Sequence, residues 1–515
     1  MTLTTLPHLS VNTYNLTVIV LVAIGTISTA YGLAVIGSTV GQPNFYTYFD
    51  FESAPAAPGY KHTTSMIGAL NGINSAGAFM GCILQAWTAD SYGRKTTIRL
   101  GAAILILGGA LCSGAVHIAM FLVGRFVAGL GAGILACIVP IYQAEVSTAD
   151  TRGAMVCVTG IMYAVGYSLA GWLGYACWFM DADSPAAEFA WRFPLAFQVL
   201  FPLCVLAGTP LIPESPRWLV AKEKREEALS VLQRLHSNSH NNNQASEEFE
   251  LMEKQLELDR SITSKSKWPG HSLISTAPNR KRSLIATILM VGNQFLGTFV
   301  LTNYGVLIYT SLGLTGSIPL LLNACWTSFT LIGNTWTALY IDRFGRRPFL
   351  LLGATGCTAC MVFLCALTAV YLDTDNTAGL RAAVFFIFFY IFFWCFFVDA
   401  TQFAYLAEIF PNHLRSQGVA LGLGWFYLSS EVTLVAAPVG LDRIGWRFYL
   451  VLIVPSTIYI VLIYLLFPET KGRTLEEMGR VFGEELVASS EADSGHGDDR
   501  RGKGEGESQM VEGIL

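Results

Sequence analysis

Long runs of apolar residues follow one another along most of the chain, and short polar turns separate them. The hydrocarbon core of a bilayer is about 30 Å thick, and a helix crosses it with roughly 20 apolar residues. Runs of this length predict an all-α membrane protein with twelve transmembrane helices. The helices are expected at residues 16–41, 63–88, 98–118, 119–142, 153–179, 192–212, 284–310, 317–341, 349–372, 381–409, 414–440 and 446–467.

The composition agrees with this prediction and narrows the possible chemistry. Of the 515 residues, 53% are hydrophobic and 13% are charged, which excludes a set of ordinary soluble domains. The eleven cysteines fall inside predicted helices, where packing is their usual role. The eight histidines lie in loops or at helix edges, and the chain has no phosphate-binding P-loop motif. We therefore expect no enzyme, no metal site and no cofactor.

The positive charges of the short loops predict the orientation of the chain. Lys and Arg gather in the loops after even-numbered helices and in the segment 218–282, whereas the opposite loops hold scattered ones such as Lys61 and Arg443. The positive-inside rule then places the basic loops and both termini in the cytoplasm. The expected result is a multi-pass protein of the plasma membrane.

Three charged motifs occur twice, in the same order. The motif "DSYGRK" at 90–95 returns as "DRFGRR" at 342–347, and "PESPR" at 213–217 returns as "PETKGR" at 468–473. Between them, a Glu and an Arg seven residues apart follow the fourth and the tenth helix. The repeat indicates two six-helix bundles related by a pseudo-twofold axis, an arrangement typical of transporters with a site between the halves.

The repeated charges are candidates for a gate at the cytoplasmic ends of the helices. Arginines and carboxylates can form charge-assisted hydrogen bonds there, and contacts made only in the closed state bias a two-state equilibrium. The other interpretation is that the charges only set the topology. The candidate gating residues are Asp90, Arg94, Lys95, Glu145, Arg152, Asp342, Arg346, Arg347, Glu408 and Arg415.

Together with these motifs, the stretch "GRFVAGLGAGILACIVPIYQAEVSTADTRG" at 124–153 resembles the sugar porter family of the major facilitator superfamily. The segments "LLLN" at 320–323 and "PVGLDRIGWRFY" at 438–449 look most like the fungal hexose, lactose and cellodextrin carriers of that family. The resemblance implies alternating-access transport of a mono- or disaccharide. It also implies a small-molecule substrate and the lipid bilayer as partners, no nucleic acid, and a monomer as the functional unit.

Four segments are expected along the chain. They are an N-terminal six-helix bundle at 1–217, a cytoplasmic helical and polar loop at 218–282, a C-terminal six-helix bundle at 283–480 and a disordered cytoplasmic tail at 481–515. The loop is charged and then Asn-rich, with a loose insertion near 237–246. The tail has almost no apolar content, which disfavours a packed core.

The substrate site is where this sequence departs from the family. Sugar porters carry a phrase like QQxxGxNxxxYY in the seventh helix, and this chain reads "NQFLGTFVLTNY" at 293–304. Gly160, Phe403 and Phe426 stand where the family has a glutamine, a tryptophan and an asparagine. The pocket is therefore expected to have lost amides and kept aromatic rings. The substrate-binding candidates are Asn293, Gln294, Phe299, Asn303, Tyr304, Phe403, Tyr427 and Glu431.

These departures leave the substrate class open. Each lost hydrogen-bonding partner costs roughly 0.5–1.5 kcal/mol, which weakens the usual hexose pose. Aromatic faces suit the apolar side of a pyranose and also flatter solutes. Besides a sugar, the alternatives are a less polar metabolite (a phenolic, an organic acid or a secondary metabolite) and a nutrient sensor built on the same fold.

Energy coupling is predicted from the first helix. Proton-coupled sugar porters carry an aspartate there that faces an arginine of the fourth helix, and this chain has Arg125 but Gly32 at the aspartate's position. A residue that cannot ionise cannot load a proton, so facilitative uniport is expected. Glu431 and, less directly, Asp399 are carboxylates inside predicted helices and could instead couple transport to protons.

Overall fold

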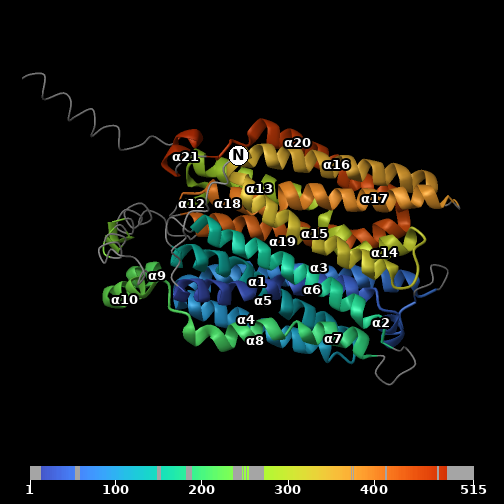
Figure 1. The fold of residues 1–515 in the computed structure, drawn as a ribbon, viewed down its shortest axis with the longest axis horizontal. Helices are drawn as coiled ribbons and strands as arrows, with labels where there is room; N and C mark the ends of the chain where they lie inside the picture. The colour runs from blue at the N-terminus through green and yellow to red at the C-terminus, as the bar shows by residue number, and fades with distance from the viewer. Residues whose placement is uncertain are drawn as a thin grey trace, which may run out of the picture.

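The structure is a computed structural model, and it describes residues 13–52, 58–147, 152–180, 188–235, 246, 249–250, 252–254, 272–372, 374, 376–411, 414–471 and 475–483. Within these residues all regular secondary structure is helical. Most of the long helices lie side by side along one common direction (Figure 1). We take that direction as the membrane normal.

The first half of the bundle, here called the N-half, covers residues 13–211. It has six spans: α1, α3, α4, α5 and α6 are the first five, and α7 and α8 follow each other as a broken sixth span. The elements are α1 (Thr13–Val40), α2 (Pro43–Tyr48), α3 (Tyr60–Tyr92), α4 (Arg94–Ser113), α5 (Ile118–Val146), α6 (Arg152–Cys177), α7 (Phe189–Phe197), α8 (Leu200–Gly208) and the 3-10 turn η1 (Thr209–Leu211).

The second half, here called the C-half, covers residues 277–466 and repeats the pattern of six spans. Its elements are α13 (Ala277–Phe295), α14 (Thr298–Ser311), α15 (Ile318–Phe344), α16 (Arg346–Tyr371), α17 (Thr377–Phe393), the π turn η2 (Trp394–Val398), α18 (Asp399–Glu408), α19 (Arg415–Ile444), the 3-10 turn η3 (Gly445–Arg447) and α20 (Phe448–Leu466). Among the described residues, α9 (Pro216–Ala221), α10 (Arg225–Leu235), α12 (Ser272–Ser275) and α21 (Leu475–Phe482) lie outside the halves.

Each of the twelve predicted runs is helical over most of its length. Among the described residues, nine segments are long and apolar enough to cross a membrane, and one of them, Gln417–Leu466, contains two of the predicted helices. The other two predicted spans are α6 and α15. Buried asparagines and threonines, such as Asn323, Thr330 and Asn334, make α15 less apolar than its neighbours.

Two spans of the C-half are broken part-way along. Gly297 has φ +95°, a left-handed conformation that glycine adopts without strain, and it separates α13 from α14. The π turn η2 interrupts the span formed by α17 and α18. Such turns are frequent at functional sites because they redirect the side chains that follow them.

The two halves meet along two helix pairs, α3 with α19 and α6 with α15. Small residues allow the backbones to approach closely, as is usual between membrane helices. A Cβ atom on Gly72 of α3 would lie 2.1 Å from a methyl group of Val435 in α19. In the second pair, the indole of Trp172 donates a hydrogen bond of 2.8 Å to the hydroxyl of Ser328. Packing and polar contacts therefore both hold the halves together.

The expected cytoplasmic loop and tail are described only in part. α9 and α10 lie beside the end of the N-half and α21 beside the end of the C-half, at the same end of the molecule (Figure 1). The Asn-rich stretch 237–246 and the tail beyond 483 lie almost wholly outside the described residues. Because α21 continues to Phe482, the helical part of the C-terminal segment extends past the predicted boundary at 480.

Candidate functional site

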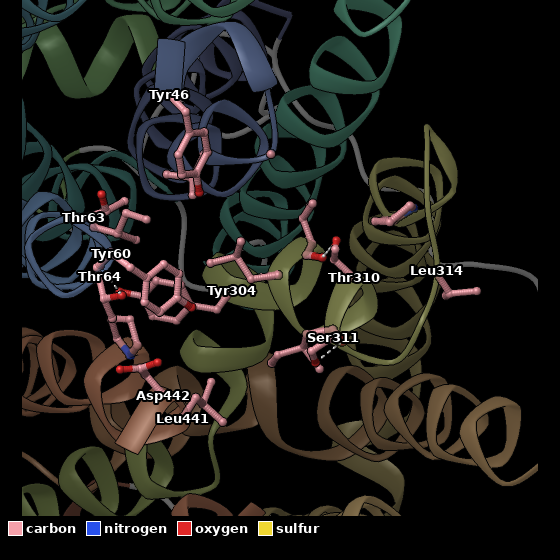
Figure 2. Close-up of a pocket in the computed structure, with 18 of the residues that line it drawn as sticks. Tyr46, Tyr60, Thr63, Thr64, Tyr304, Thr310, Ser311, Leu314, Leu441 and Asp442 are labelled. Atoms are coloured by element: carbon pink, nitrogen blue, oxygen red, sulfur yellow. Dashed lines mark hydrogen bonds between the residues drawn. The ribbon is translucent and has the colours of Figure 1, made fainter. Parts of the chain in front are cut away.

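A large vestibule opens between the halves at one end of the bundle (Figure 2). It has a volume of about 830 Å³, within the range of small-molecule sites, and both halves line it. The turns 90–95 and 342–347 lie at the opposite end, which we call the basic end. The aromatic residues of the lining are Tyr46, Phe51, Tyr60, Trp178, Tyr304, Trp446 and Tyr449.

Tyr304 closes the vestibule toward the interior of the membrane. Its side chain is fully buried although it lines the cavity, and its phenol donates a hydrogen bond of 2.7 Å to the carbonyl of Leu434 in α19. The side chain of Asn71, in α3 of the N-half, hydrogen-bonds to the same phenol. Tyr304 therefore links three helices from both halves, and it is the one predicted substrate-binding residue that lines the vestibule.

Gln294 lies deeper than Tyr304 and keeps part of its amide free. Its Oε1 accepts a hydrogen bond of 2.9 Å from the hydroxyl of Ser430. Its Nε2 is buried and has no hydrogen-bond partner among the described residues. A buried donor without a partner is costly, so a solute oxygen that reached it would gain a full hydrogen bond. The geometry favours Gln294 as a substrate contact.

Asn293 and Asn303 are placed differently from Gln294. The amide of Asn293 donates 2.8 Å to Gln402 and accepts 2.9 Å from the phenol of Tyr459, so it joins three spans of the C-half. The amide of Asn303 donates 3.0 Å to the carbonyl of Phe299, one turn back in α14. Both side chains have other partners in this state, and these contacts do not favour their predicted role in substrate binding.

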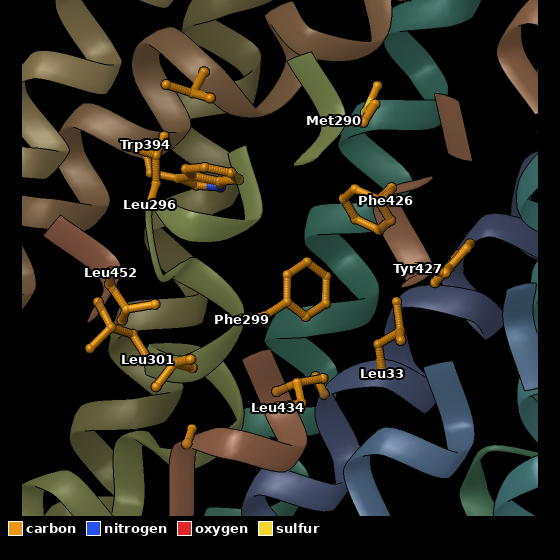
Figure 3. Close-up of a cluster of buried hydrophobic side chains, with 14 of the residues drawn as sticks. Leu33, Met290, Leu296, Phe299, Leu301, Trp394, Phe426, Tyr427, Leu434 and Leu452 are labelled. Atoms are coloured by element: carbon orange, nitrogen blue, oxygen red, sulfur yellow. The ribbon is translucent and has the colours of Figure 1, made fainter. Parts of the chain in front are cut away.

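Aromatic rings fill the space between the halves near these residues. Phe299 meets Phe426 edge to face at 5.4 Å, and Tyr427 packs against the other side of Phe426 at 5.2 Å (Figure 3). Phe403 lies parallel to Tyr163 of the N-half, with ring centroids 6.3 Å apart. The rings come from α14, α18, α19 and α6. They form an apolar surface at the predicted site, as the loss of amides suggested.

Gly160 in α6 stands where the family has a glutamine, and it faces open space. A Cβ atom built on Gly160 would have nothing within 4 Å. A larger side chain would therefore fit there without displacing a neighbour. The missing amide has not been replaced by another group at this position.

The predicted contact between the first and fourth helices is present. Arg125 is fully buried, and its Nη1 donates 2.9 Å to the carbonyl of Gly32 while its Nε donates 3.2 Å to the carbonyl of Leu70. Among the described residues no carboxylate pairs with Arg125. Gln198, between α7 and α8, occupies the adjacent space, since a Cβ on Gly32 would lie 2.7 Å from its Nε2. Neither amide atom of Gln198 has a partner among the described residues.

Sequence reasoning did not identify Gln198. The only sequence feature that pointed to Gln198 was its polar side chain inside the apolar run 192–212. Many buried glutamines have no functional role. The contact with Gly32 becomes visible only when the first and sixth spans are packed together. Gln198 is the neutral group closest to the position where related carriers have a carboxylate.

The two intramembrane carboxylates have different surroundings. Glu431 lies beside Gly72 at the contact between α19 and α3, and its carboxylate forms no hydrogen bond or ion pair with any described residue. Asp399, the first residue of α18, accepts a hydrogen bond of 2.9 Å from the amide of Asn334 in α15. Glu431 is therefore the freer of the two groups.

At the basic end of the N-half, Arg94 is the centre of a charge cluster. Its guanidinium donates to both oxygens of Glu145, at 2.9 and 3.0 Å, and it lies 3.5 Å from the exposed Asp90. The backbone N–H groups of Arg94 and Lys95 donate to Oε1 of Glu214, at 2.8 and 3.1 Å. Glu214 thus caps the N-terminus of α4, where the helix dipole favours a negative charge.

The C-half repeats this cluster around Arg346. Its guanidinium donates to Glu408 at 2.8 and 3.1 Å and lies 2.7 Å from Asp342. The backbone N–H groups of Arg346 and Arg347 donate to the two oxygens of Glu469, at 3.0 and 3.1 Å. The cluster therefore has the same composition in both halves and a similar geometry, although both donors of Arg346 reach one oxygen of Glu408.

The glycine of each turn is required by this geometry. Gly93 has φ +92°, and a Cβ on it would lie 2.6 Å from a carboxylate oxygen of Glu214. Gly345 has φ +99°, and a Cβ there would lie 2.8 Å from Glu469. Glu214 and Glu469 belong to the repeated motifs but were not among the predicted gating residues. Their matching positions in the two copies of the repeat could have identified them.

The remaining gating candidates are less central. The side chain of Arg152 lies outside the described residues. Arg415 donates a hydrogen bond of 3.1 Å to the carbonyl of Ala407. The side chain of Arg347 donates to the carbonyl of Tyr464. Among the described residues, the printed contacts of Arg94 and Arg346 join helix ends of one half and the carboxylate that follows its last span, so they hold helix ends together within a half.

Comparisons with known proteins agree with this architecture. The family model described as "Sugar (and other) transporter" matches residues 18–482. The MFS-type transporter criB of Aspergillus cristatus is 29% identical over 453 residues, which cover 88% of this chain and 90% of that protein. The sugar transporter STL1 of Saccharomyces cerevisiae is 26% identical over 432 residues, covering 82% of this chain and 73% of the relative.

Among solved structures, the chain is similar to the proton:xylose symporter XylE of E. coli bound to 6-bromo-6-deoxy-D-glucose. The TM-score is 0.76 at 22% identity, and the match covers 91% of this chain and 99% of XylE. At this identity the likeness concerns the fold. It confirms the predicted arrangement of twelve membrane helices in two six-helix bundles.

Proposed function

The chain belongs to the sugar (and other) transporter family, and on that premise we propose that it carries a mono- or disaccharide by alternating access. The family is one of membrane carriers and not of enzymes. The observation that carries the proposal is the vestibule of about 830 Å³, which both halves line and which ends on Tyr304 near the free amide of Gln294. The charge clusters are intact at the opposite end, as expected when that end is closed.

A second candidate is a carrier of a less polar metabolite, and one observation favours it. Phe299 and Phe426 stand where sugar porters have asparagines, the rings of Phe403 and Tyr427 pack around Phe426, and Gly160 has open space where the family has a glutamine. A flat phenolic or secondary metabolite would stack on such rings without needing several hydrogen bonds. The free amide of Gln294 and the hydroxyl-rich vestibule favour the sugar.

Uptake of radiolabelled solutes in a transporter-null cell separates the candidates. We expect saturable uptake of at least one hexose or disaccharide, and little uptake of phenolics or organic acids. Uptake confined to a phenolic or secondary metabolite would assign the second candidate. No flux of any solute, together with a solute-dependent cellular signal, would identify a sensor instead of a carrier.

We further propose that the basic end faces the cytoplasm and that the protein acts as a monomer in the plasma membrane. The basic loops support this orientation through the positive-inside rule. The first turn of α1 lies at the basic end, because the phenol of Tyr14 donates to the carbonyl of Leu211 and Arg234 of α10 lies over its ring, and α21 lies at the same end (Figure 1). The proposed domain limits remain 1–217, 218–282, 283–480 and 481–515.

Transport is proposed to be facilitative because no carboxylate pairs with Arg125 among the described residues. In proteoliposomes with an imposed pH gradient and no substrate gradient, we expect no net accumulation of substrate. Accumulation that a protonophore abolishes would contradict uniport. If the Glu431→Gln variant lost that accumulation, the coupling role would belong to α19.

The Gly32→Asp variant tests the same position from the opposite side. Its carboxylate would lie between Arg125 and the amide of Gln198, whose flexible end can move aside. We expect uptake by this variant to become dependent on pH, because the new carboxylate must be neutralised or paired as the helices move. The Gly32→Asn variant is the matched control and should stay independent of pH. Equal pH profiles of the two variants would show that this position does not couple protons.

A further inference from the structure

The vestibule carries an uneven set of charges. Two carboxylates line it, Glu52 from the stretch after α2 in the N-half and Asp442 near the end of α19 in the C-half. None of its lining residues is a Lys, Arg or His. Neither Glu52 nor Asp442 forms an ion pair with a described residue. The cavity therefore contains two negative charges, one from each half, and no compensating positive charge in its wall.

Basic residues near the vestibule lie at its outside rather than in its lining. Lys61 and His62 follow Tyr60 in the first turn of α3, and Arg443 follows Asp442 in α19; all three are exposed. In water their attraction for a solute is screened over roughly 8–10 Å at moderate salt. Because Glu52 and Asp442 line the cavity and the three basic residues do not, the carboxylates lie nearer to a solute inside it and dominate the potential there.

Like the carboxylates, several hydroxyl groups of the lining act as hydrogen-bond acceptors toward the cavity. Thr310 donates its proton to the carbonyl of Val306 at 2.9 Å, and Ser311 donates to Ile308 at 2.8 Å (Figure 2). On the other half, Thr64 donates to the carbonyl of Tyr60 at 3.0 Å. With their protons used within their own helices, these hydroxyls offer lone pairs to the cavity. They can accept hydrogen bonds from a solute but cannot donate to one.

An organic anion would meet two like charges in this wall and no cationic side chain, and the hydroxyls of Thr64, Thr310 and Ser311 would offer it no proton. A neutral polyol brings many hydroxyl donors, which the lone pairs and the two carboxylates can accept. The phenols and indoles of the lining are neutral donors and aromatic surfaces, both of which suit a sugar ring. The charge, the hydrogen bonding and the apolar surface of the vestibule point to one class of solute.

We propose that the vestibule is an entry site that binds uncharged, hydroxyl-rich solutes and repels anions, with Glu52 and Asp442 as the residues that determine this charge selection. The inference rests on the proposed transport function and deepens it, because it removes organic acids from the list of substrates. It assigns the choice of charge to the vestibule, ahead of the contacts near Gln294.

The test measures the charge selection without measuring transport. A cysteine is placed in the wall by Thr310→Cys, and its reaction with cationic, neutral and anionic methanethiosulfonate reagents is timed in the membrane-embedded protein. The chain without an added cysteine gives the background. The control is Val116→Cys, between α4 and α5 at the same end of the molecule, where Val116 is 72% exposed and does not line the vestibule.

We expect the cationic reagent to react about tenfold faster than the anionic one at Thr310→Cys, relative to the same ratio at Val116→Cys. Adding Glu52→Gln and Asp442→Asn should bring the two ratios together, and each single substitution should remove part of the difference. Raising the salt concentration should also reduce the difference, because both carboxylates are exposed to solvent.

Two results would overturn the proposal. One is an anionic reagent that reacts as fast as the cationic one, relative to the control. The other is a difference that persists in the double variant and in both single variants. A protein that shows the charge selection but carries no sugar in flux assays would disprove the proposed function and leave the charge selection of the vestibule intact, so the two failures are distinguishable.

Discussion

The Arg94→Ala variant should lose at least roughly tenfold in steady-state transport while solute binding remains detectable. Arg94 and Glu145 are only 13% and 12% exposed, and the guanidinium binds both carboxylate oxygens. Removing one partner of a largely buried ion pair costs about 3–5 kcal/mol, because the other charge is left without compensation. The lost ion pair lies at the closed basic end and not at the vestibule. The variant should therefore change the conformational equilibrium and leave the binding site intact.

Arg346→Ala should act in the same direction with a smaller effect. Its partner Glu408 is 31% exposed and also accepts a hydrogen bond of 2.6 Å from Thr470, so it keeps a partner in the variant. Lys224→Ala is the matched control, because Lys224 is an exposed cation near the same end and pairs only with Glu227. All variants are compared for uptake, for solute binding and for abundance at the cell surface.

Normal uptake by both arginine variants at normal surface abundance would mean that the charged residues only set the topology and do not gate transport. The geometry argues against that outcome. A charge that only sets topology needs no carboxylate bound by two guanidinium donors, no capping carboxylate and no glycine with positive φ, and each half has all three features. Arg94 and Arg346 bind carboxylates of their own half, so the clusters can act as a gate only if the helix ends they join separate when the basic end opens.

The Gln294→Ala variant should raise the KM about tenfold or more. The Nε2 of Gln294 is buried and has no hydrogen-bond partner among the described residues, and one decade in affinity corresponds to about 1.4 kcal/mol. The hydroxyl of Ser430 would lose its acceptor in the side chain of Gln294 but keeps the carbonyl of Phe426, so the fold should survive. An unchanged KM in uptake assays would exclude Gln294 from the substrate site.

The paired substitution is Phe299→Asn, which restores the family's residue in α14. We expect it to widen the range of hexoses accepted, because an amide would replace the ring that packs on Phe426. A substrate profile identical to that of the parent protein would assign Phe299 to packing. The two variants distinguish two roles. Gln294 would contact the substrate through a hydrogen-bond donor, whereas Phe299 would shape the pocket through its volume.

Much of the fold could be predicted from the sequence because a bilayer imposes a strict length on each apolar run. The twelve spans and the duplication of the charged turns followed from hydrophobic length and from motif order. A charge cluster that includes Arg94 and Glu145 was also predicted, because both residues occur again at matching positions in the second copy of the internal repeat. These features depend on local sequence and on the membrane, and little on side-chain packing.

The site was predicted less well, for a physical reason. Asn293 and Gln294 are neighbours in the sequence, but consecutive residues of a helix point about 100° apart. One amide is therefore fully bonded inside the C-half, whereas the other keeps a free donor. Gln198 was missed because its contact with Gly32 depends on how the first and sixth spans pack. Periodicity places such residues on a helix and does not say which of them faces a solute.

Counterflow in proteoliposomes tests the central claim most directly. Vesicles that contain the purified protein are loaded with an unlabelled sugar and diluted into a trace of the labelled one. A carrier that alternates between the vestibule end and the basic end predicts a transient rise of labelled sugar inside above its outside concentration, which protein-free vesicles do not show. Labelled sugar that never exceeds the protein-free control, for any hexose or disaccharide, would contradict alternating-access sugar transport by this protein.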